Sequence, residues 1–143
     1  MVEQERAEPK KTVLVVEDLD DSRFAMKLAM ELSGYDALEA TNGQEAVEVA
    51  QREQPDVILM DLGLPVLDGF TATRLIREKK GLRNVPIVAV SANATAEYRV
   101  KALAAGCSEY VTKPIDFDRL KRLVSHFAQS RDEETGSQGG GNN

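Results

Sequence analysis

Short apolar runs alternate with amphipathic segments along the middle of the chain. Runs rich in Val, Ile and Leu that are bounded by polar or turn residues are typical of β-strands. Five segments fit this description, namely residues 12–16, 36–40, 56–60, 86–90 and 109–112. Three of them are almost continuously apolar, as expected of strands that are covered on both faces of a sheet. The pattern therefore predicts five strands, the central ones fully buried.

Between these runs, apolar residues recur every three or four positions, as they do on one face of a helix. This spacing predicts helices over residues 21–33, 42–53, 70–79, 94–105 and 116–127. Asn42, followed three residues later by Glu45, has the pattern of a capping box at the start of the second helix.

The spacing also predicts which helical side chains face the core. The predicted inward residues are Phe24, Leu28 and Leu32 in the first helix, Ala96, Val100, Leu103 and Ala104 in the fourth, and Leu120, Leu123, Val124 and Phe127 in the last.

Five strand–helix units in succession indicate a parallel sheet with helices on both faces, joined by right-handed crossovers. Among open doubly wound sheets, the flavodoxin-like order 2-1-3-4-5 fits this number of strands. We therefore expect an α/β fold with five parallel strands flanked by five helices. In such a fold the ligand site lies beyond the carboxyl ends of the strands, where strands 1 and 3 are neighbours.

The two ends of the chain differ from its middle. Residues 1–11 are polar and of mixed charge, and we expect them to form an N-terminal extension. Residues 129–143 contain no large apolar side chain and are rich in Gly, Ser, Asn and Gln, so they are expected to be a disordered tail. The folded domain is then predicted to span residues 12–128.

Composition narrows the class of protein. The net charge of −6, from 18 basic and 24 acidic residues, argues against a nucleic-acid partner. No apolar run approaches the roughly 18 residues needed to span a bilayer, and no signal-peptide core precedes the domain, so we expect no membrane contact. The single cysteine, Cys107, fits a reducing compartment, which predicts a cytoplasmic location.

Polar side chains follow four of the predicted strands. Glu17 and Asp18 follow the first, Asp61 the third, Ser91 the fourth and Lys113 the fifth. Because the carboxyl ends of parallel strands meet at one edge of the sheet, these groups are expected to lie close together.

Three carboxylates at one place repel one another unless a cation lies among them, and oxygen ligands of this kind favour Mg²⁺. Lys113 could hold an anion, and Ser91 could donate a hydrogen bond to it. Asp61 in such surroundings is equipped to accept a phosphoryl group. Taken singly, Asp18 could instead be a helix cap or a solvated acid, and Ser91 and Lys113 could be ordinary surface groups.

Four motifs, occurring in order, resemble the receiver domain of bacterial two-component response regulators over residues 12–128. They are "VLVVEDLDDSR", "VILMDLGLPVLDG", "VAVSA" and "YVTKP".

The resemblance implies that Asp61 is the phosphoacceptor and that Mg²⁺ is bound by Glu17, Asp18, Asp61 and the carbonyl of Gly63. It implies that Ser91 and Lys113 contact the phosphoryl group, that Tyr110 rotates inward on activation, and that the Lys113–Pro114 bond is cis. Gly63 and Asn93 occupy positions that tune autodephosphorylation in the family.

The function expected from this resemblance is that of a single-domain response regulator rather than an enzyme acting on other substrates. A histidine kinase or a histidine phosphotransfer protein would supply the phosphoryl group. Output would then pass through contact with a downstream protein, for which the candidate surface comprises Glu97, Tyr98, Lys101, Glu109 and Lys121. Formation of a homodimer through the same face is a further option.

Several alternatives remain open at the level of sequence. The chain could be a receiver excised from a hybrid sensor kinase, or a pseudo-receiver that binds partners without phosphorylation. The spacing of Asp18 and Asp20 matches a haloacid-dehalogenase-like phosphatase, which would leave Asp61 unexplained. A flavodoxin-like electron carrier is disfavoured because the anionic segment "EDLDDSR" would repel a flavin phosphate.

Overall fold

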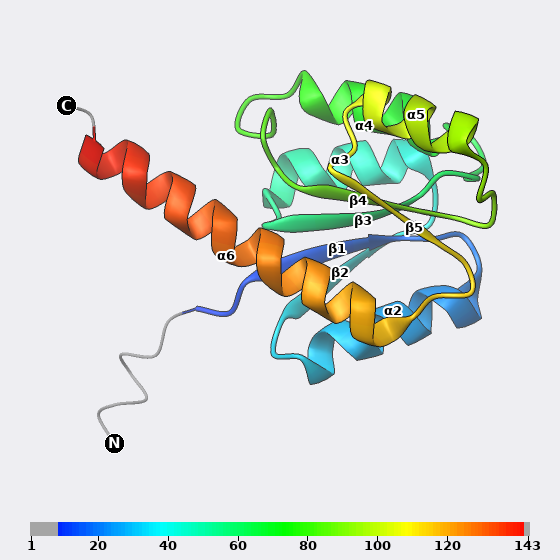
Figure 1. The fold of residues 1–143 in the computed structure, drawn as a ribbon, viewed down its shortest axis with the longest axis horizontal. Coiled ribbons are helices and arrows are strands. Elements are labelled where there is room, and N and C mark those ends of the chain that lie inside the picture. The colour runs from blue at the N-terminus through cyan, green and yellow to red at the C-terminus, as the bar shows by residue number, and fades with distance from the viewer. Residues whose placement is uncertain (1–8, 142–143) are drawn as a thin grey trace.

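A five-stranded parallel sheet forms the centre of the molecule (Figure 1). The computed structural model describes residues 9–141, and for residues 131–141 the backbone alone. The strands lie in the order β2-β1-β3-β4-β5, which confirms the predicted fold class. Their bounds are β1 Thr12–Val16, β2 Asp36–Ala40, β3 Val57–Asp61, β4 Ile87–Ser91 and β5 Glu109–Thr112.

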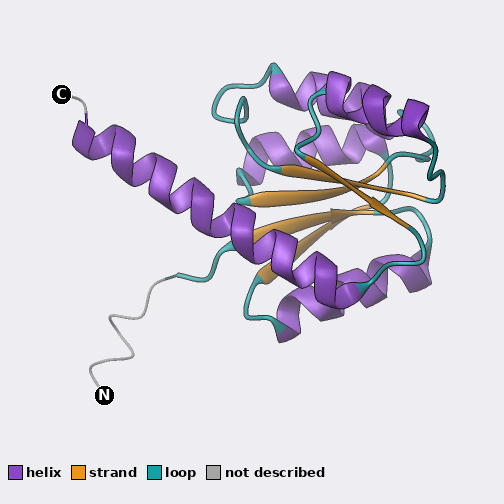
Figure 2. Ribbon diagram, viewed as in Figure 1, coloured by secondary structure: helices purple, strands orange, loops and turns teal. Residues whose placement is uncertain are grey.

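Helices cover both faces of this sheet (Figure 2). Helices α2 (Asp20–Leu32) and α6 (Phe117–Gly141) pack on one face, where their apolar side chains join those of Val13, Leu59 and Val88. Helices α3 (Gly43–Glu53), α4 (Gly69–Arg77) and α5 (Ala96–Ala105) pack on the other. The central strand β3 is therefore buried along its whole length.

Strands β3 and β4 are each shifted by one residue from the predicted ranges 56–60 and 86–90. The carboxylate of Asp56 accepts a hydrogen bond from the backbone N–H of Thr12 at 2.8 Å, outside the strand. Pro86 has no N–H to donate, although its carbonyl accepts from Ile58. Asp61 and Ser91 are consequently the last paired residues of their strands, opposite Val90 and Thr112 respectively.

The predicted core face of α2 is wrong. The exposed fractions of Phe24, Leu28 and Leu32 are 64%, 41% and 77%, whereas Met26 and Met30 are buried. Both sets of residues satisfy helical spacing, so the spacing could not tell which side of the helix meets the sheet. Helix α2 thus carries an exposed apolar ridge, defined here as Phe24, Leu28 and Leu32.

The predicted face of α5 is also wrong, because its buried residues are Ala102 and Ala105 rather than Val100 and Leu103. Alanine has a small side chain, so the α5 backbone can lie close to its neighbours, and Val100 and Leu103 are exposed. By contrast, the predicted face of α6 is confirmed: Leu120 and Val124 are buried, and Leu123 and Phe127 pack partly buried beside them.

Helix α6 continues to Gly141, into the segment 129–143 for which sequence predicts a disordered tail. Extending an existing helix adds a backbone hydrogen bond for each residue ordered, and the segment contains no glycine before Gly136. At the other end, residues 1–8 of the predicted N-terminal extension lie outside the described residues.

The start of α3 agrees with its predicted cap in part. The side-chain oxygen of Asn42 accepts a hydrogen bond from the N–H of Glu45 at 2.8 Å, as expected. The Glu45 carboxylate, however, accepts from the N–H of Thr41 at 2.6 Å, one residue before the cap. The motif therefore satisfies two backbone donors, but with a shifted second partner.

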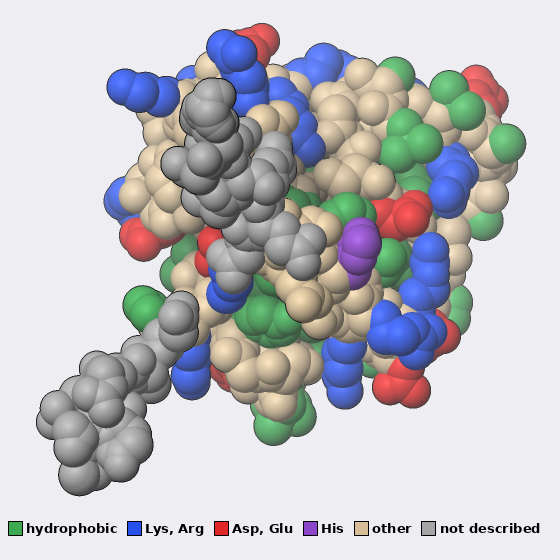
Figure 3. Space-filling model, turned by 60° about the vertical axis from the view of Figure 1, so that its left-hand side comes forward, with side chains coloured by type: hydrophobic (Ala, Val, Ile, Leu, Met, Phe, Trp, Pro, Cys, Tyr) green, Lys and Arg blue, Asp and Glu red, His purple; other side chains and the backbone are tan. Residues whose placement is uncertain are grey.

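Charged side chains on the visible face of the molecule are dispersed. Lysine and arginine side chains lie among acidic and neutral ones in Figure 3 and do not form one continuous patch. Among residues 9–141, no helix combines the length and the apolar character required to cross a membrane.

The two faces of α2 should respond differently to truncation. Met30→Ala removes a fully buried side chain and is expected to lower the free energy of unfolding by about 2–5 kcal/mol. Leu32→Ala, on the same helix but largely exposed, is expected to change it by less than about 0.5 kcal/mol. Urea denaturation of both variants measures the difference. Equal losses would contradict the assignment of the inner face.

Candidate functional site

The predicted site residues are located at the carboxyl edge of the sheet or in the loops that follow it, except Tyr110, which lies within β5. Glu17 directly follows β1, and its N–H donates to the carbonyl of Ala40 in β2 at 3.0 Å. Asp61 and Ser91 end β3 and β4, and Lys113 follows β5 directly. The strands are paired in register, so their last residues are held on a rigid framework.

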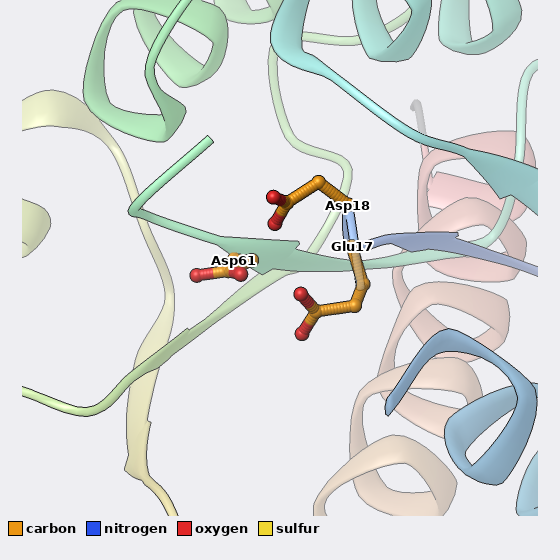
Figure 4. Close-up of side chains that lie close together, drawn as sticks. All are labelled: Glu17, Asp18 and Asp61. Atoms are coloured by element: carbon orange, nitrogen blue, oxygen red, sulfur yellow. The ribbon is translucent and has the colours of Figure 1, made fainter. Parts of the chain in front are cut away.

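The carboxylates of Glu17, Asp18 and Asp61 form a cluster in which one oxygen of each lies within 4.8 Å of the others. Figure 4 shows the three side chains gathered at the ends of β1 and β3. Glu17 is 0% exposed and Asp61 6% exposed, while Asp18 is open to solvent. This set of oxygen ligands suits a hard divalent cation that retains water molecules on its open side.

Asp20 is not part of this cluster. Its exposed carboxylate pairs with the guanidinium of Arg23 at 2.7 Å. The spacing of Asp18 and Asp20 that matched a phosphatase motif therefore does not bring two carboxylates to one site.

Lys113 supplies the positive charge within the site. Its Nζ lies 2.9 Å from Oε1 of Glu17 and 3.4 Å from Oδ2 of Asp61. Burial alone would lower the pKa of this ammonium, but the hydrogen bond with Glu17 and the charge of Asp61 raise it above its usual value. Lys113 is therefore positively charged at neutral pH.

The pKa of the Glu17 carboxyl is perturbed by its surroundings. Burial, reinforced by the neighbouring Asp61, raises the pKa of Glu17 to about 6, although the hydrogen bonds from Lys113 and from the N–H of Leu19 oppose the change. The protein alone therefore does not fully neutralise the negative charge of this carboxylate. Such a charge is expected of a group that binds a cation.

The loop after β3 lies tightly against Asp61. The N–H of Gly63 donates to Oδ1 of Asp61 at 3.0 Å. A Cβ added at Gly69 would lie only 2.4 Å from the carbonyl oxygen of Asp61, so this position requires glycine because of close packing. Between them, Val66 adopts a φ of 70°, which is unusual for a β-branched residue. The hydrogen bond at Gly63 and the close packing at Gly69 thus hold both ends of the loop near Asp61.

Ser91 and Tyr110 are both hydrogen-bonded to the backbone of Asn93. The N–H of Asn93 donates to Oγ of Ser91 at 3.0 Å, and its carbonyl accepts from the hydroxyl of Tyr110. The ring of Tyr110 is buried, so in this structure it already points inward. The Lys113–Pro114 bond is cis, as the resemblance implied.

A cavity of about 370 Å³ opens above Asp61 and includes one residue that sequence reasoning assigned elsewhere. Tyr98 lines this cavity together with Ser91 and Lys113, whereas we had expected it on an exposed output surface. Tyr98 lies in the first turn of α5 and does not directly follow a strand, so the sequence did not indicate its place in the site. That place depends on how α5 packs against α4.

Comparison with known proteins agrees with this geometry. A family model of the response regulator receiver domain matches residues 13–125, and the chain belongs to this family. The resemblance inferred from the four motifs is thereby confirmed.

The chain is similar to several individual members of this family. It is 32% identical over 117 residues to the polar-differentiation response regulator DivK of Brucella anthropi, an alignment that covers 82% of this chain and 95% of DivK. The receiver domain of the sensor histidine kinase PA1611 from Pseudomonas aeruginosa was solved with magnesium in its active site cleft. It is 36% identical with a TM-score of 0.79, and the match covers 85% of this chain and 99% of that one. The chemotaxis response regulator CheY4 of Vibrio cholerae is 25% identical, also with a TM-score of 0.79, over 83% of this chain and 99% of its own.

The raised pKa of Glu17 predicts how the stability of the metal-free protein depends on pH. The folded state binds the proton more tightly than the unfolded chain, so the ionised carboxylate destabilises the fold above pH 6, and this penalty disappears below pH 4.5. Glu17→Gln keeps an oxygen for Lys113 but has no charge. Its stability relative to the unmodified protein should therefore rise by about 2 kcal/mol between pH 4 and pH 8.

Urea denaturation in the presence of EDTA across this pH range measures the difference between the two proteins. Asp20→Asn, which changes an exposed acid outside the cluster, serves as the control. A difference for Glu17→Gln that stays constant with pH would show that burial does not perturb this carboxylate.

Proposed function

We propose that this receiver domain accepts a phosphoryl group on Asp61 in a magnesium-dependent reaction and signals through phosphorylation-dependent protein contacts. One observation carries the proposal. Asp61 is the carboxylate at the carboxyl end of the central strand, with Lys113 3.4 Å away and the acids Glu17 and Asp18 beside it.

The metal in this proposal is Mg²⁺, held by Glu17, Asp18 and Asp61 with the backbone carbonyl of Gly63. The buried, poorly compensated charge of Glu17 supports this assignment, as does the magnesium ion in the related receiver of PA1611. Magnesium, when bound, would neutralise charge on the phosphoryl oxygens.

The chain's own residues would perform the transfer. An oxygen of Asp61 attacks the phosphorus of a phosphohistidine, the phosphorus–nitrogen bond breaks, and the imidazole leaves and takes up a proton. Lys113 exchanges part of its contact with Glu17 for a phosphoryl oxygen. Ser91, whose Oγ already accepts from Asn93, donates its hydroxyl hydrogen to another phosphoryl oxygen. The acyl phosphate formed on Asp61 is the signalling state.

Communication with the surface would pass through Asn93. Both Ser91 and Tyr110 are bonded to its backbone, so a movement of Ser91 toward the phosphoryl group disturbs the anchor of the Tyr110 hydroxyl. Two differently populated arrangements of these residues would constitute the switch. A shift from 1:99 to 99:1 requires about 5.5 kcal/mol of differential stabilisation.

The phosphodonor in this proposal is a histidine kinase or a histidine phosphotransfer protein. A groove of about 300 Å³ beside the site supports its placement. This groove shares Lys113 with the cavity above Asp61 and has apolar walls from Ala25, Ile115 and Phe117. A helical partner seated there would bring a histidine side chain within reach of Asp61.

Output would involve the face formed by α5 and β5. The sequence-based surface comprises Glu97, Tyr98, Lys101, Glu109 and Lys121. Apolar area lies beside it, because Val100 and Leu103 are 65% and 42% exposed. A downstream protein or a second copy of the chain are the partners proposed for it. Cys107 is a free, buried cysteine, in keeping with the cytoplasmic location we propose.

Phosphorylation of Asp61 can be tested with a small phosphodonor. After incubation with Mg²⁺ and acetyl phosphate, intact-mass analysis should show an added mass of about 80 Da, for one phosphoryl group. No adduct should form on Asp61→Asn. None should form on the unmodified protein when EDTA is present during the incubation. No adduct on the unmodified protein, or an adduct that persists in Asp61→Asn, would refute the assignment.

The affinity for Mg²⁺ should depend on the acids of the cluster and not on acids outside it. Asp18→Asn should weaken Mg²⁺ binding at least about tenfold, because a charged ligand of the ion is lost. Asp20→Asn should leave the affinity within about twofold, since Asp20 pairs with Arg23 outside the cluster. Isothermal titration calorimetry measures both. Similar effects of the two substitutions would contradict the proposed ligand set.

A further inference from the structure

The cavity above Asp61 is bordered mostly by small or engaged side chains. A Cβ added at Gly63 would meet only Oδ1 of Asp61, at 3.9 Å, so this border carries no covering side chain. Ala92 is small. The side-chain oxygen of Asn93 accepts from the N–H and the hydroxyl of Thr95, at 2.9 and 2.7 Å, and is therefore turned toward α5.

Tyr98 and Leu19 are the large side chains on this border. Among the described residues that line the cavity, Tyr98 supplies the only aromatic ring. A neighbouring cavity of about 320 Å³ shares Gly63 and Tyr98 with the first. The ring of Tyr98 therefore forms part of the wall between the two cavities, on the side that Gly63 leaves uncovered.

Contacts on several sides hold this ring in place. It packs edge-on against Phe70, with ring centroids 5.1 Å apart and an angle of 80° between the rings. Phe70 is itself 4% exposed and belongs to the core. The ammonium of Lys101 lies 4.6 Å from the centroid of Phe70 and 6.0 Å from that of Tyr98, within cation–π range of both. The N–H of Tyr98 donates to the capping hydroxyl of Thr95 at 3.2 Å.

We propose that Tyr98 is a shielding residue that limits the access of water to the phosphoryl group on Asp61 and thereby prolongs the phosphorylated state. This inference rests on the proposed phosphorylation of Asp61. Loss of the signal is a hydrolysis: water attacks phosphorus, and the bond from phosphorus to the Asp61 oxygen breaks. The products are the Asp61 carboxylate and inorganic phosphate, with the second proton of the water released to solvent.

Two structural features make the ring effective in this role. Attacking water must approach phosphorus on the side opposite the Asp61 oxygen, which is the open side of the cavity. Gly63 has no side chain, and the side-chain oxygen of Asn93 is engaged by Thr95, so the ring of Tyr98 is the large group on this side of the cavity. Leu19, the N-cap of α2, lines the cavity from another element. Shielding depends on the ring and its packing rather than on the phenolic hydroxyl, which sets the choice of variants.

The test measures the decay of phosphorylated protein. The chain is labelled with acetyl phosphate and Mg²⁺, the donor is removed by desalting, and the phosphorylated fraction is followed by intact mass. Tyr98→Ala should hydrolyse about three- to tenfold faster than the unmodified protein, equivalent to lowering the barrier by about 0.7–1.4 kcal/mol. Tyr98→Phe, which keeps the ring and its contact with Phe70, should decay within about twofold of the unmodified rate.

A second readout distinguishes shielding from a general structural effect. Hydroxylamine cleaves acyl phosphates directly, and the folded Tyr98→Ala variant should become more sensitive to it than Tyr98→Phe, while the urea-denatured proteins should react alike. Tyr98→Leu provides a smaller, still apolar replacement if the alanine variant is unfolded by circular dichroism, and its decay should be intermediate.

The outcomes are separable. Decay of Tyr98→Ala or Tyr98→Leu at the unmodified rate would overturn the inference while leaving phosphorylation of Asp61 intact. Equal acceleration in Tyr98→Phe would also overturn it, because the hydroxyl and not the ring would then control hydrolysis. A failure of the unmodified protein to form any adduct would instead refute the proposed function.

Discussion

The in-register pairing of parallel strands is the constraint on which the site depends. β1, β3 and β4 are buried on both faces, so their position and register are fixed by packing along their length. Their last residues then have no freedom to separate, and three carboxylates, a hydroxyl and an ammonium are held at one edge. Bringing these acids together is electrostatically unfavourable, as the raised pKa of Glu17 indicates. The packing of the sheet stabilises the fold enough to offset this unfavourable term.

Lys113 links this cost to function. In the metal-free structure its ammonium contacts both Glu17 and Asp61, and it partly compensates two buried acids. The same ammonium would have to contact the phosphoryl group in the phosphorylated protein. In the proposed mechanism, the ammonium that contacts both acids in the resting site is shared with the phosphoryl group after phosphorylation. Metal, proton and phosphoryl group would then act on one interacting set of charges.

Sequence reasoning predicted the topology, the helix order and the residues at the strand ends, because these depend on local periodicity and on the rule that parallel strands share an edge. It placed Asp61 and Ser91 just after their strands rather than within them, since Asp56 and Pro86 read as strand starts. It failed on the inner faces of α2 and α5, where two helical faces satisfied the same spacing. It did not indicate that Tyr98 also lines the cavity above Asp61, because this position depends on long-range packing against Phe70.

The ridge of Phe24, Leu28 and Leu32 has a consequence for how such a domain can diverge. Helix α2 meets the sheet through Met26 and Met30, and the side chains on its outer side are largely exposed. They can be exchanged without disturbing the sheet edge or the acids attached to it. The two sides of this helix are thus under different constraints. Packing against the sheet restricts the inner side, whereas the outer side is free to change. A lineage of such domains could therefore change its partners while keeping its reactive centre.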